Sequence, residues 1–460
     1  MSYLLNNRQD QQAMLEAIGV QSLAELLACV PAALRLHRPL ELPAAMSELE
    51  LTQHLETLAA RNTSAGQSAG QALCFLGGGN YDHFIPAVVD SLAERGEFYT
   101  SYTPYQPEVS QGNLQVMFEY QTLICQLTGM DVSNASLYDG GSATIEAALL
   151  CMSATRRTGK VVTAACVHPE YRQVMQTYLA NLNTQLVTLA VPDGRVALPS
   201  LAAALDDQVA CVVLQHPNFF GCLEEVSAVS DMVHAAGALL VLVFDPLSLG
   251  ILKRPAELGA DVAVAEGQVL GSPMQCGGSG LGILACREQY LRRLPGRLAG
   301  QTVDRRGRRC WVLTLQTREQ HIRRDKATSN ICTNQGLLAL RAAIYLSCLG
   351  PHGLREVSER CAWKAHYCSA CLTACQRFER RFAPPVFKEF VIRDRRGEVP
   401  QLLAQATQAG ILAGVPLAPW YPELADCFLV AVTEKRTRSD IDRLSACLAG
   451  TLKTPGASHA

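Results

Sequence analysis

The chain lacks three features that would place it in a membrane or on nucleic acid. None of its 460 residues belongs to an uninterrupted apolar run of the ~18 residues that a membrane span needs, and the longest runs, such as 238–244, have strand length. The first ten residues are mostly polar, so no basic-plus-apolar leader is expected there. The 40 basic residues nearly balance the 42 acidic ones, and a formal net charge of -2 gives no bulk field for nucleic acid or anionic lipid.

Cysteine, in contrast, is abundant, with 18 residues. Cys368 and Cys371 form a CxxC near Cys375 and His366, but all four would lie along one helix. Buried thiols are therefore favoured over a zinc site, and no metal is expected. Free thiols in apolar segments act as small hydrophobes. Because no secretory signal is expected, a reducing cytoplasm is the expected location. The scattered examples are Cys74, Cys125, Cys151, Cys166 and Cys211.

The sequence predicts four parts. Residues 1–70 form a helical arm, in which Ser22-x-x-Glu25 and Ser47-x-x-Glu50 are typical of capping boxes. A large domain is expected over 71–325 and a smaller C-terminal part over 326–452. Residues 453–460 are expected to form a tail.

Strand and helix patterns alternate through the large domain. Strands are expected at 161–166, 185–190, 209–215, 239–244 and 261–265, and a helix at 227–236 ends at Gly237. This alternation predicts an α/β fold whose mostly parallel sheet is covered on both faces. Active sites of such sheets lie beyond the carboxyl ends of the strands, where Asp245 and Gln268 are found.

The C-terminal part is expected to contain a long helix over 336–349, strands at 387–392 and 428–432, and a helix over 401–409. The basic run Arg305–Arg309 precedes it. A solvated hairpin turn is favoured there over a nucleic-acid patch, because no aromatic residues interleave with the arginines.

Four long motifs identify a family resemblance. The chain resembles the P-protein family of the glycine cleavage system, in its split form with separate alpha and beta subunits, from about Met14 to Leu448. The motifs that carry the resemblance are Tyr102-Thr-Pro-Tyr105-Gln-Pro-Glu108-Val-Ser-Gln111-Gly112, Tyr138-Asp139-Gly140-Gly141-Ser142-Ala143-Thr144, His216-Pro217-Asn218-Phe219-Phe220-Gly221-Cys222 and the segment 323–335.

The resemblance implies the aminotransferase-like fold of pyridoxal-phosphate (PLP) enzymes, fold type I, with a smaller C-terminal α/β domain. In that fold an aspartate at the position of Asp245 pairs with the pyridinium nitrogen, and a Schiff-base lysine follows on a later strand end. Gln268 stands where this lysine belongs. An amide nitrogen is not a nucleophile toward an aldehyde, so the chain alone is expected to hold no PLP covalently. Lys326 lies among charged neighbours and outside the fold's lysine position, so it is not expected to replace that lysine.

The other cofactor-site positions are expected to be vestigial. Ser142 and Thr144 follow a glycine pair at a helix start, where PLP enzymes of this fold hold the phosphate. The negative charge of Asp139 would repel a phosphate there. An empty phosphate-binding loop is therefore favoured over an occupied one. Asn218 matches a residue near the cofactor's phenolic oxygen, or is a turn residue. The vestigial positions are Ser142, Thr144, Asn218, Asp245 and Gln268.

A proline-stiffened loop carries the pocket candidates Tyr102, Thr103, Tyr105 and Glu108. The residue types alone fit a polar substrate pocket and a packed inter-domain loop equally well, and the resemblance favours a shared active site.

The resemblance implies an alpha subunit of glycine dehydrogenase (aminomethyl-transferring), an oxidoreductase of glycine catabolism. PLP would be carried by a beta subunit in an α2β2 heterotetramer, and the aminomethyl group would pass to the lipoyl group of the H-protein. One alternative is a non-catalytic regulatory or binding protein on the same fold. Another is an independent PLP enzyme that uses a different lysine.

Overall fold

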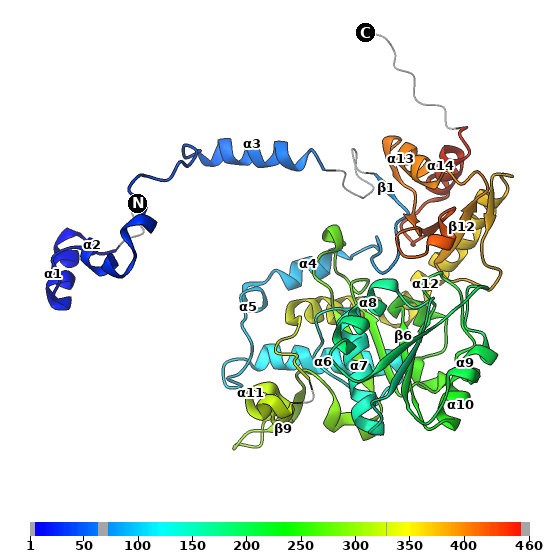
Figure 1. Cartoon of the computed structure of the whole chain (residues 1–460), viewed down its shortest axis with the longest axis horizontal. Helices are drawn as coiled ribbons and strands as arrows, with labels where there is room; N and C mark the ends of the chain where they lie inside the picture. Colours follow the sequence, from blue (N-terminus) through cyan, green and yellow to red (C-terminus); the bar gives the residue numbers. More distant parts are fainter. Residues whose placement is uncertain (1–4, 63–71, 328, 452–460) are drawn as a thin grey trace, which may run out of the picture. The chain divides into compact units, whose positions relative to one another are not determined.

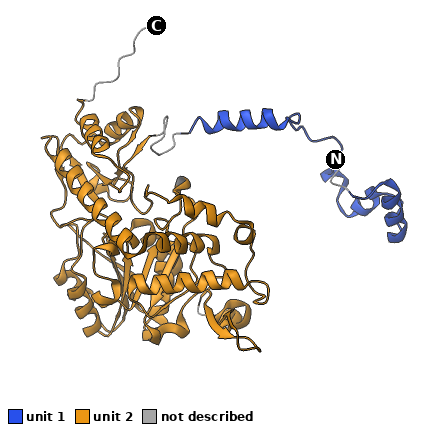
Figure 2. Cartoon of the chain, turned by 180° about the vertical axis from the view of Figure 1, so that it is seen from behind, with its two compact units in different colours: residues 1–63 blue, residues 64–460 orange. Residues whose placement is uncertain are grey.

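The computed structural model describes residues 5–62, 72–327 and 329–451, which divide into two compact units, 1–63 and 64–460 (Figure 2). The predicted boundary at residue 70 and the predicted tail 453–460 lie outside the described residues. The division of the second unit at residues 325 and 326 stays a prediction.

The first unit contains α1 (Arg8–Ile18), α2 (Leu23–Leu26) and α3 (Glu48–Ala59). The predicted capping box at Ser47 is confirmed, because its hydroxyl and the Glu50 carboxylate each accept the other residue's amide. The predicted box at Ser22 is wrong: its side chain makes no cap bond, and Glu25 accepts the amide of Gln21 instead. The described side chains of this unit are all exposed or half-buried.

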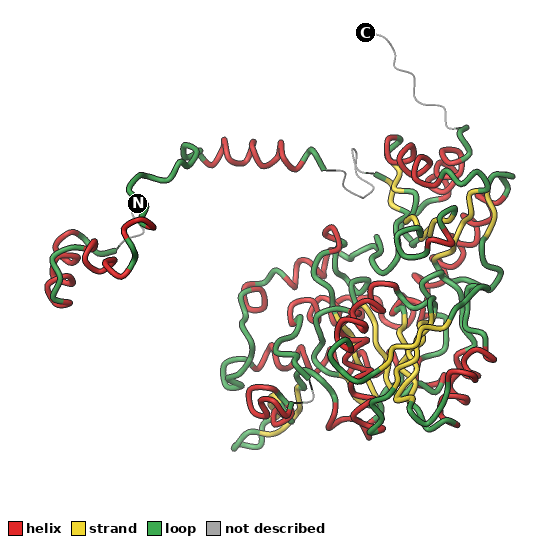
Figure 3. The backbone as a smooth tube through the Cα atoms, viewed as in Figure 1, coloured by secondary structure: helices red, strands yellow, loops and turns green. Residues whose placement is uncertain are grey.

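The second unit is built on a seven-stranded sheet in the order β2-β8-β7-β6-β5-β3-β4. Figure 1 labels its strand β6, and Figure 3 draws the strands in yellow. The strands from β7 to β4 run parallel. At one edge β8 pairs with β7 in antiparallel fashion, and β2 pairs with β8 in antiparallel fashion. All five predicted strands of the large domain are confirmed within two residues at each end. The strands are β2 (Val132–Ser133), β3 (Lys160–Ala164), β4 (Gln185–Leu189), β5 (Val209–His216), β6 (Leu239–Phe244), β7 (Val262–Glu266) and β8 (Gly282–Cys286).

Both faces of this sheet are buried, which explains its unbroken apolar strands. In β6, Leu240 and Leu242 join the core under α6 (Gln111–Thr128), α10 (Val226–Ala235) and α12 (Gly336–Thr373). Val241 and Val243 point the other way, into a second core under α7 (Gly140–Thr155) and α8 (Pro169–Leu179). Successive side chains alternate between faces, so a strand covered on both sides must be apolar throughout.

A smaller antiparallel sheet follows, in the order β11-β12-β15-β14. Its strands are β11 (Phe378–Arg380), β12 (Glu389–Asp394), β14 (Val415–Pro416) and β15 (Cys427–Ala431), and α13 (Val399–Gln408) and α14 (Arg438–Leu448) accompany it. The early strand β1 (Leu73–Cys74) pairs with β13 (Ile411–Leu412), so the start of the second unit is anchored beside this sheet.

Helix α12 is longer than predicted, because it continues past a break at Gly350 and Pro351 to Thr373. Among the described helices it is the one long and apolar enough, by composition, to cross a membrane. Here it contacts α4 (Ala87–Ala93), α6 and α14, and Leu340, Tyr345 and Cys368 on it belong to the core. In this fold it is therefore a core helix.

The basic run forms a turn, as predicted. Strands β9 (Ala299–Val303) and β10 (Arg309–Leu313) pair in antiparallel fashion on either side of it. We call residues 299–313 the basic hairpin.

Candidate functional site

The candidate site lies at the carboxyl ends of the parallel strands, where such sheets bind ligands. Asp245 directly follows β6, Glu266 ends the neighbouring strand β7, and Gln268 comes two residues later. Parallel pairing of β6 with β7 brings these ends to the same edge.

The carboxylate of Asp245 pairs with a buried ammonium group. Lys388 Nζ lies 2.7 Å from Asp245 Oδ2, and the Lys388 side chain is 1% exposed, so bulk water does not screen the pair. The same ammonium lies 3.6 Å from the centre of the Tyr81 ring and 3.1 Å from His83 Nε2. Lys388 immediately precedes β12, so the small sheet supplies the cation to the large one. Asp245 thus has its positive partner within the chain.

Sequence reasoning missed Lys388. The available signal was the charged pair Lys388-Glu389 inside the apolar stretch Val386–Ile392. Charged side chains are seldom fully buried unless they are paired.

Glu389, the residue after Lys388, also forms hydrogen bonds to the segment that contains Tyr81. Its carboxyl oxygens accept hydrogen bonds of 2.7 Å from the Gly78 amide and the Tyr81 hydroxyl. Burial raises the pKa of Glu389 to about 7. Burial, with the nearby Glu389 charge, raises the pKa of Tyr81 well above its ordinary value, so Tyr81 remains a proton donor in this bond.

The Gln268 side chain has a structural role, because it is hydrogen-bonded to the backbone of two other segments. It is buried, and its Nε2 donates to the carbonyl oxygens of Ser272 at 2.7 Å and Tyr81 at 3.3 Å. Its Oε1 accepts the Tyr81 amide at 3.0 Å. Both ends of the amide are therefore used to hold the backbone in place.

The backbone amides of the glycine loop at the start of α7 already donate hydrogen bonds to carboxylates of this chain. Asp139 accepts the Ser142 amide at 2.6 Å, and Glu266 accepts the Gly140 amide at 3.0 Å. The Thr144 hydroxyl donates to the Gly140 carbonyl oxygen at 2.7 Å. A helix N-terminus attracts anions, and here that position is taken by the chain's own acids. A phosphate would meet negative charge.

Aromatic side chains fill the space beside this loop. The Tyr171 ring stacks on His168 with centroids 4.4 Å apart, and a Cβ added at Gly140 would collide with the Tyr171 hydroxyl. The cavity bounded by Asp245 and Lys388 measures about 40 Å³, enough for only a few water molecules. A neighbouring cavity of about 260 Å³ is lined by three acids, Asp139, Glu170 and Glu266.

The residues present do not fit PLP. The lysine position holds a glutamine whose amide is engaged, the ring-nitrogen partner already has a cation, and the phosphate position is acidic. We therefore derive no catalytic step through PLP bound to this chain.

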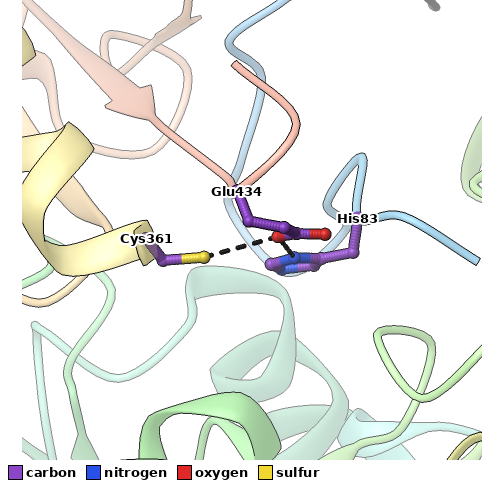
Figure 4. Close-up of side chains that lie close together, drawn as sticks. All are labelled: His83, Cys361 and Glu434. Atoms are coloured by element: carbon purple, nitrogen blue, oxygen red, sulfur yellow. Dashed lines mark hydrogen bonds and ion pairs between the residues drawn. The ribbon is translucent and has the colours of Figure 1, made fainter. Parts of the chain in front are cut away.

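A cluster of His83, Cys361 and Glu434 lies next to Lys388 and has the residue types of a metal site (Figure 4). His83 Nδ1 lies 2.6 Å from Glu434 Oε2, and the Cys361 thiol donates to the same oxygen at 3.4 Å. Burial opposes ionisation of Glu434, but the interaction with His83 outweighs it and lowers this pKa to about 2. Burial raises the pKa of the Cys361 thiol, and an ammonium lies against the other ring nitrogen of His83. A neutral thiol beside a cation favours a hydrogen-bonded tie over a metal site.

The tyrosine loop, residues 102–108, projects from the surface. Tyr102 is 85% exposed, and Tyr105 is 53% exposed, so both are accessible to another molecule. The Tyr105 hydroxyl accepts a 3.1 Å bond from the buried Arg297, whose guanidinium carbon lies 5.4 Å from the centre of the Tyr105 ring. Glu108 is exposed, and Thr103 is half-buried.

The structure separates the two groups of predicted site residues. Tyr102 and Thr103 line a cavity of about 220 Å³ with Met117 and Leu337, and the described lining of that cavity does not include Asp245 or Gln268. The tyrosine loop is thus not part of the vestigial cofactor pocket within one chain.

Asn218 lies where a turn residue would lie, and Lys326 lies where a solvated surface lysine would lie. Asn218 Nδ2 donates to Gly194 O and Glu224 Oε1, and its Oδ1 accepts the amides of Phe220 and Cys222. It is fully used in a buried turn. Lys326 is exposed.

The mostly parallel sheet with a small antiparallel domain is the architecture of PLP-dependent enzymes of fold type I, as predicted. A solved variant of C-DES with glycine covalently linked to its PLP cofactor shares this fold, with a TM-score of 0.58 at 14% identity over 79% of this chain and 93% of that chain. The chain belongs to the glycine cleavage system P-protein family, whose model matches residues 1–448.

Closer relatives support this assignment over the full length. The chain is 50% identical, over 98% of its length and 100% of the relative's, to the probable glycine dehydrogenase (decarboxylating) subunit 1 of Carboxydothermus hydrogenoformans. It also resembles the crystal structure of glycine decarboxylase (P-protein) of the glycine cleavage system in inhibitor-bound form. That match has a TM-score of 0.88 and 42% identity over 98% of this chain and 100% of that chain.

Proposed function

We propose that this chain is the alpha subunit of a glycine-decarboxylating enzyme and works only together with a beta subunit. The observation that carries the proposal is the closed cofactor position, where Lys388 pairs with Asp245 and Gln268 replaces a lysine. The chain matches relatives named subunit 1 over their full length, and that name implies a partner subunit, to which we assign the missing cofactor chemistry.

The proposed partners follow the family resemblance. The beta subunit holds PLP in an α2β2 heterotetramer, and a lipoylated H-protein accepts the aminomethyl group. Bound to the beta subunit, PLP supplies the electron sink that makes loss of carbon dioxide from glycine feasible. A cytoplasmic location is part of the proposal, and it rests on the sequence alone.

The tyrosine loop is the part of this chain that we propose contributes to the shared site. Tyr105 is accessible, and its oxygen already accepts a bond from Arg297, which leaves the hydroxyl proton free to donate outward. A hydroxyl held in this way can orient a small polar substrate. Tyr102, Thr103 and Glu108 would form the surrounding rim.

The central experiment is exchange of labelled bicarbonate into the carboxyl group of glycine. The purified chain alone should show no exchange, whereas addition of the beta subunit and lipoylated H-protein should produce it. A control mixture of beta subunit and H-protein without this chain measures what the partner does by itself. Robust exchange by the isolated chain would refute the half-enzyme proposal.

A second test concerns covalent cofactor binding. The chain incubated with PLP and reduced with borohydride should yield no stoichiometric pyridoxyl-lysine in peptide mass maps. Gln268→Lys should not change this result, because Lys388, Asp139 and Glu266 still occupy the surrounding positions. Full modification of a single lysine in the unaltered chain would overturn the expectation.

A further inference from the structure

A stretch of sequence rich in basic residues surrounds the basic hairpin. Residues 287–326 contain twelve Lys and Arg against four Asp and Glu, although the whole chain is nearly neutral. The turn itself exposes Arg305, Arg306, Arg308 and Arg309. Among the described residues, Arg308 is the one of these four with a carboxylate partner, Asp304 at 3.0 Å. The patch is therefore a local positive field on a neutral molecule.

The basic hairpin borders the tyrosine loop. Gln111, at the start of α6 just after the loop, donates to the Trp311 carbonyl oxygen at 2.8 Å and accepts the Trp311 amide at 2.9 Å. Arg297, two residues before β9, donates to the Tyr105 hydroxyl. A molecule docked on the hairpin would therefore lie beside the residues proposed to enter the shared site.

The side chains around the turn favour a protein over a nucleic acid. Within residues 287–326 the exposed large apolar residues are the aliphatic Val303, 64% exposed, and Ile322, 49% exposed. They suit a protein interface, and neither has a ring for base stacking. Trp311 is half-buried, and the Arg309 guanidinium lies over its ring at 5.1 Å.

We propose that the basic hairpin docks a carboxylate-rich face of the lipoylated carrier protein. This inference rests on the proposed function, because that reaction requires a carrier whose arm reaches the shared site. Complementary charge mainly accelerates encounter and sets orientation, so the contact must weaken as salt rises.

The test measures the KM for lipoylated H-protein in the assembled enzyme. Arg305→Gln with Arg306→Gln should raise this KM by about fivefold to tenfold at low salt, since each contact at an interface rim contributes modestly. The kcat at saturating carrier should change little, and the difference from the unaltered enzyme should shrink at high salt.

A matched control replaces two exposed arginines elsewhere, Arg355→Gln with Arg360→Gln on α12, and should leave the KM unchanged.

Equal KM values for the hairpin variant and the unaltered enzyme would overturn the proposal. Two other results would also overturn it. One is loss of subunit assembly by gel filtration, which would assign the hairpin to the beta subunit. The other is salt-sensitive binding of a DNA duplex that the variant loses while its KM stays the same. If exchange is absent even with all partners present, the proposed function itself fails, and that outcome is distinct from a change in KM.

Discussion

Lys388→Ala should destabilise the chain by about 3–5 kcal/mol in urea unfolding, because it leaves the Asp245 carboxylate without its buried partner. The substitution also removes the cation that lies against the Tyr81 ring. Removing one member of a buried ion pair costs far more than the pair contributes in net terms, since the remaining charge must stay out of water.

Two variants test this explanation. Arg393→Ala breaks the pair with Asp426, in which the Arg393 side chain is 48% exposed, and should cost only about 0.2–1 kcal/mol. Lys388→Met combined with Asp245→Asn removes both charges and should recover much of the loss. If Lys388→Ala behaved like the Arg393 variant, the ion pair would not be a buried structural element.

Tyr105→Phe should lower the activity of the assembled enzyme by about tenfold to a hundredfold, because a hydrogen bond to a charged substrate group contributes roughly 1.5–3 kcal/mol. Stability should change by no more than about 0.5 kcal/mol, since the ring remains under Arg297 and that guanidinium still donates to the Cys332 carbonyl oxygen. Both quantities should be measured on the same variant, with subunit assembly confirmed by gel filtration.

The matched control is Tyr178→Phe on α8, a tyrosine that is 41% exposed. It should change neither activity nor assembly. Unchanged activity of Tyr105→Phe would remove Tyr105 from the shared site, and failure to assemble would make the residue structural. A fall in kcat at constant KM for glycine would indicate an interaction made only in the transition state.

The large sheet was predictable because its physical signal is local. A strand covered on both faces must be apolar at every position, so residues 239–244 reveal β6 without knowledge of any neighbour. The absence of a lysine at Gln268 could also be recognised from the sequence, but only through the family resemblance, which gives the position where the lysine of this fold belongs. The two serine motifs show the limit of this approach. Ser47 begins a twelve-residue helix and caps it, whereas Ser22 begins a four-residue helix and does not.

The partner of Asp245 was not predictable, because it comes from a different sheet. Nothing near Asp245 in the sequence indicates that a lysine preceding β12 will reach it. The role of Asp139 was partly foreseen as opposition to a phosphate, but the bond to Ser142 makes it the helix cap as well. Such pairings arise only when distant segments are packed together, and they decide whether a cofactor position is open or closed.

The helical unit at residues 5–62 has a thermodynamic consequence. Its described side chains are all at least partly exposed, among them Met14, Leu26, Leu51 and Leu55, so burial within the unit contributes little to its folding. Any surface that binds such a segment stabilises it by linkage, by an amount that grows with the logarithm of the surface's concentration relative to its Kd. Helices as short as these are marginal in water by themselves. We therefore expect dilution to reduce the helical content of this unit before it affects the packed core of the second unit.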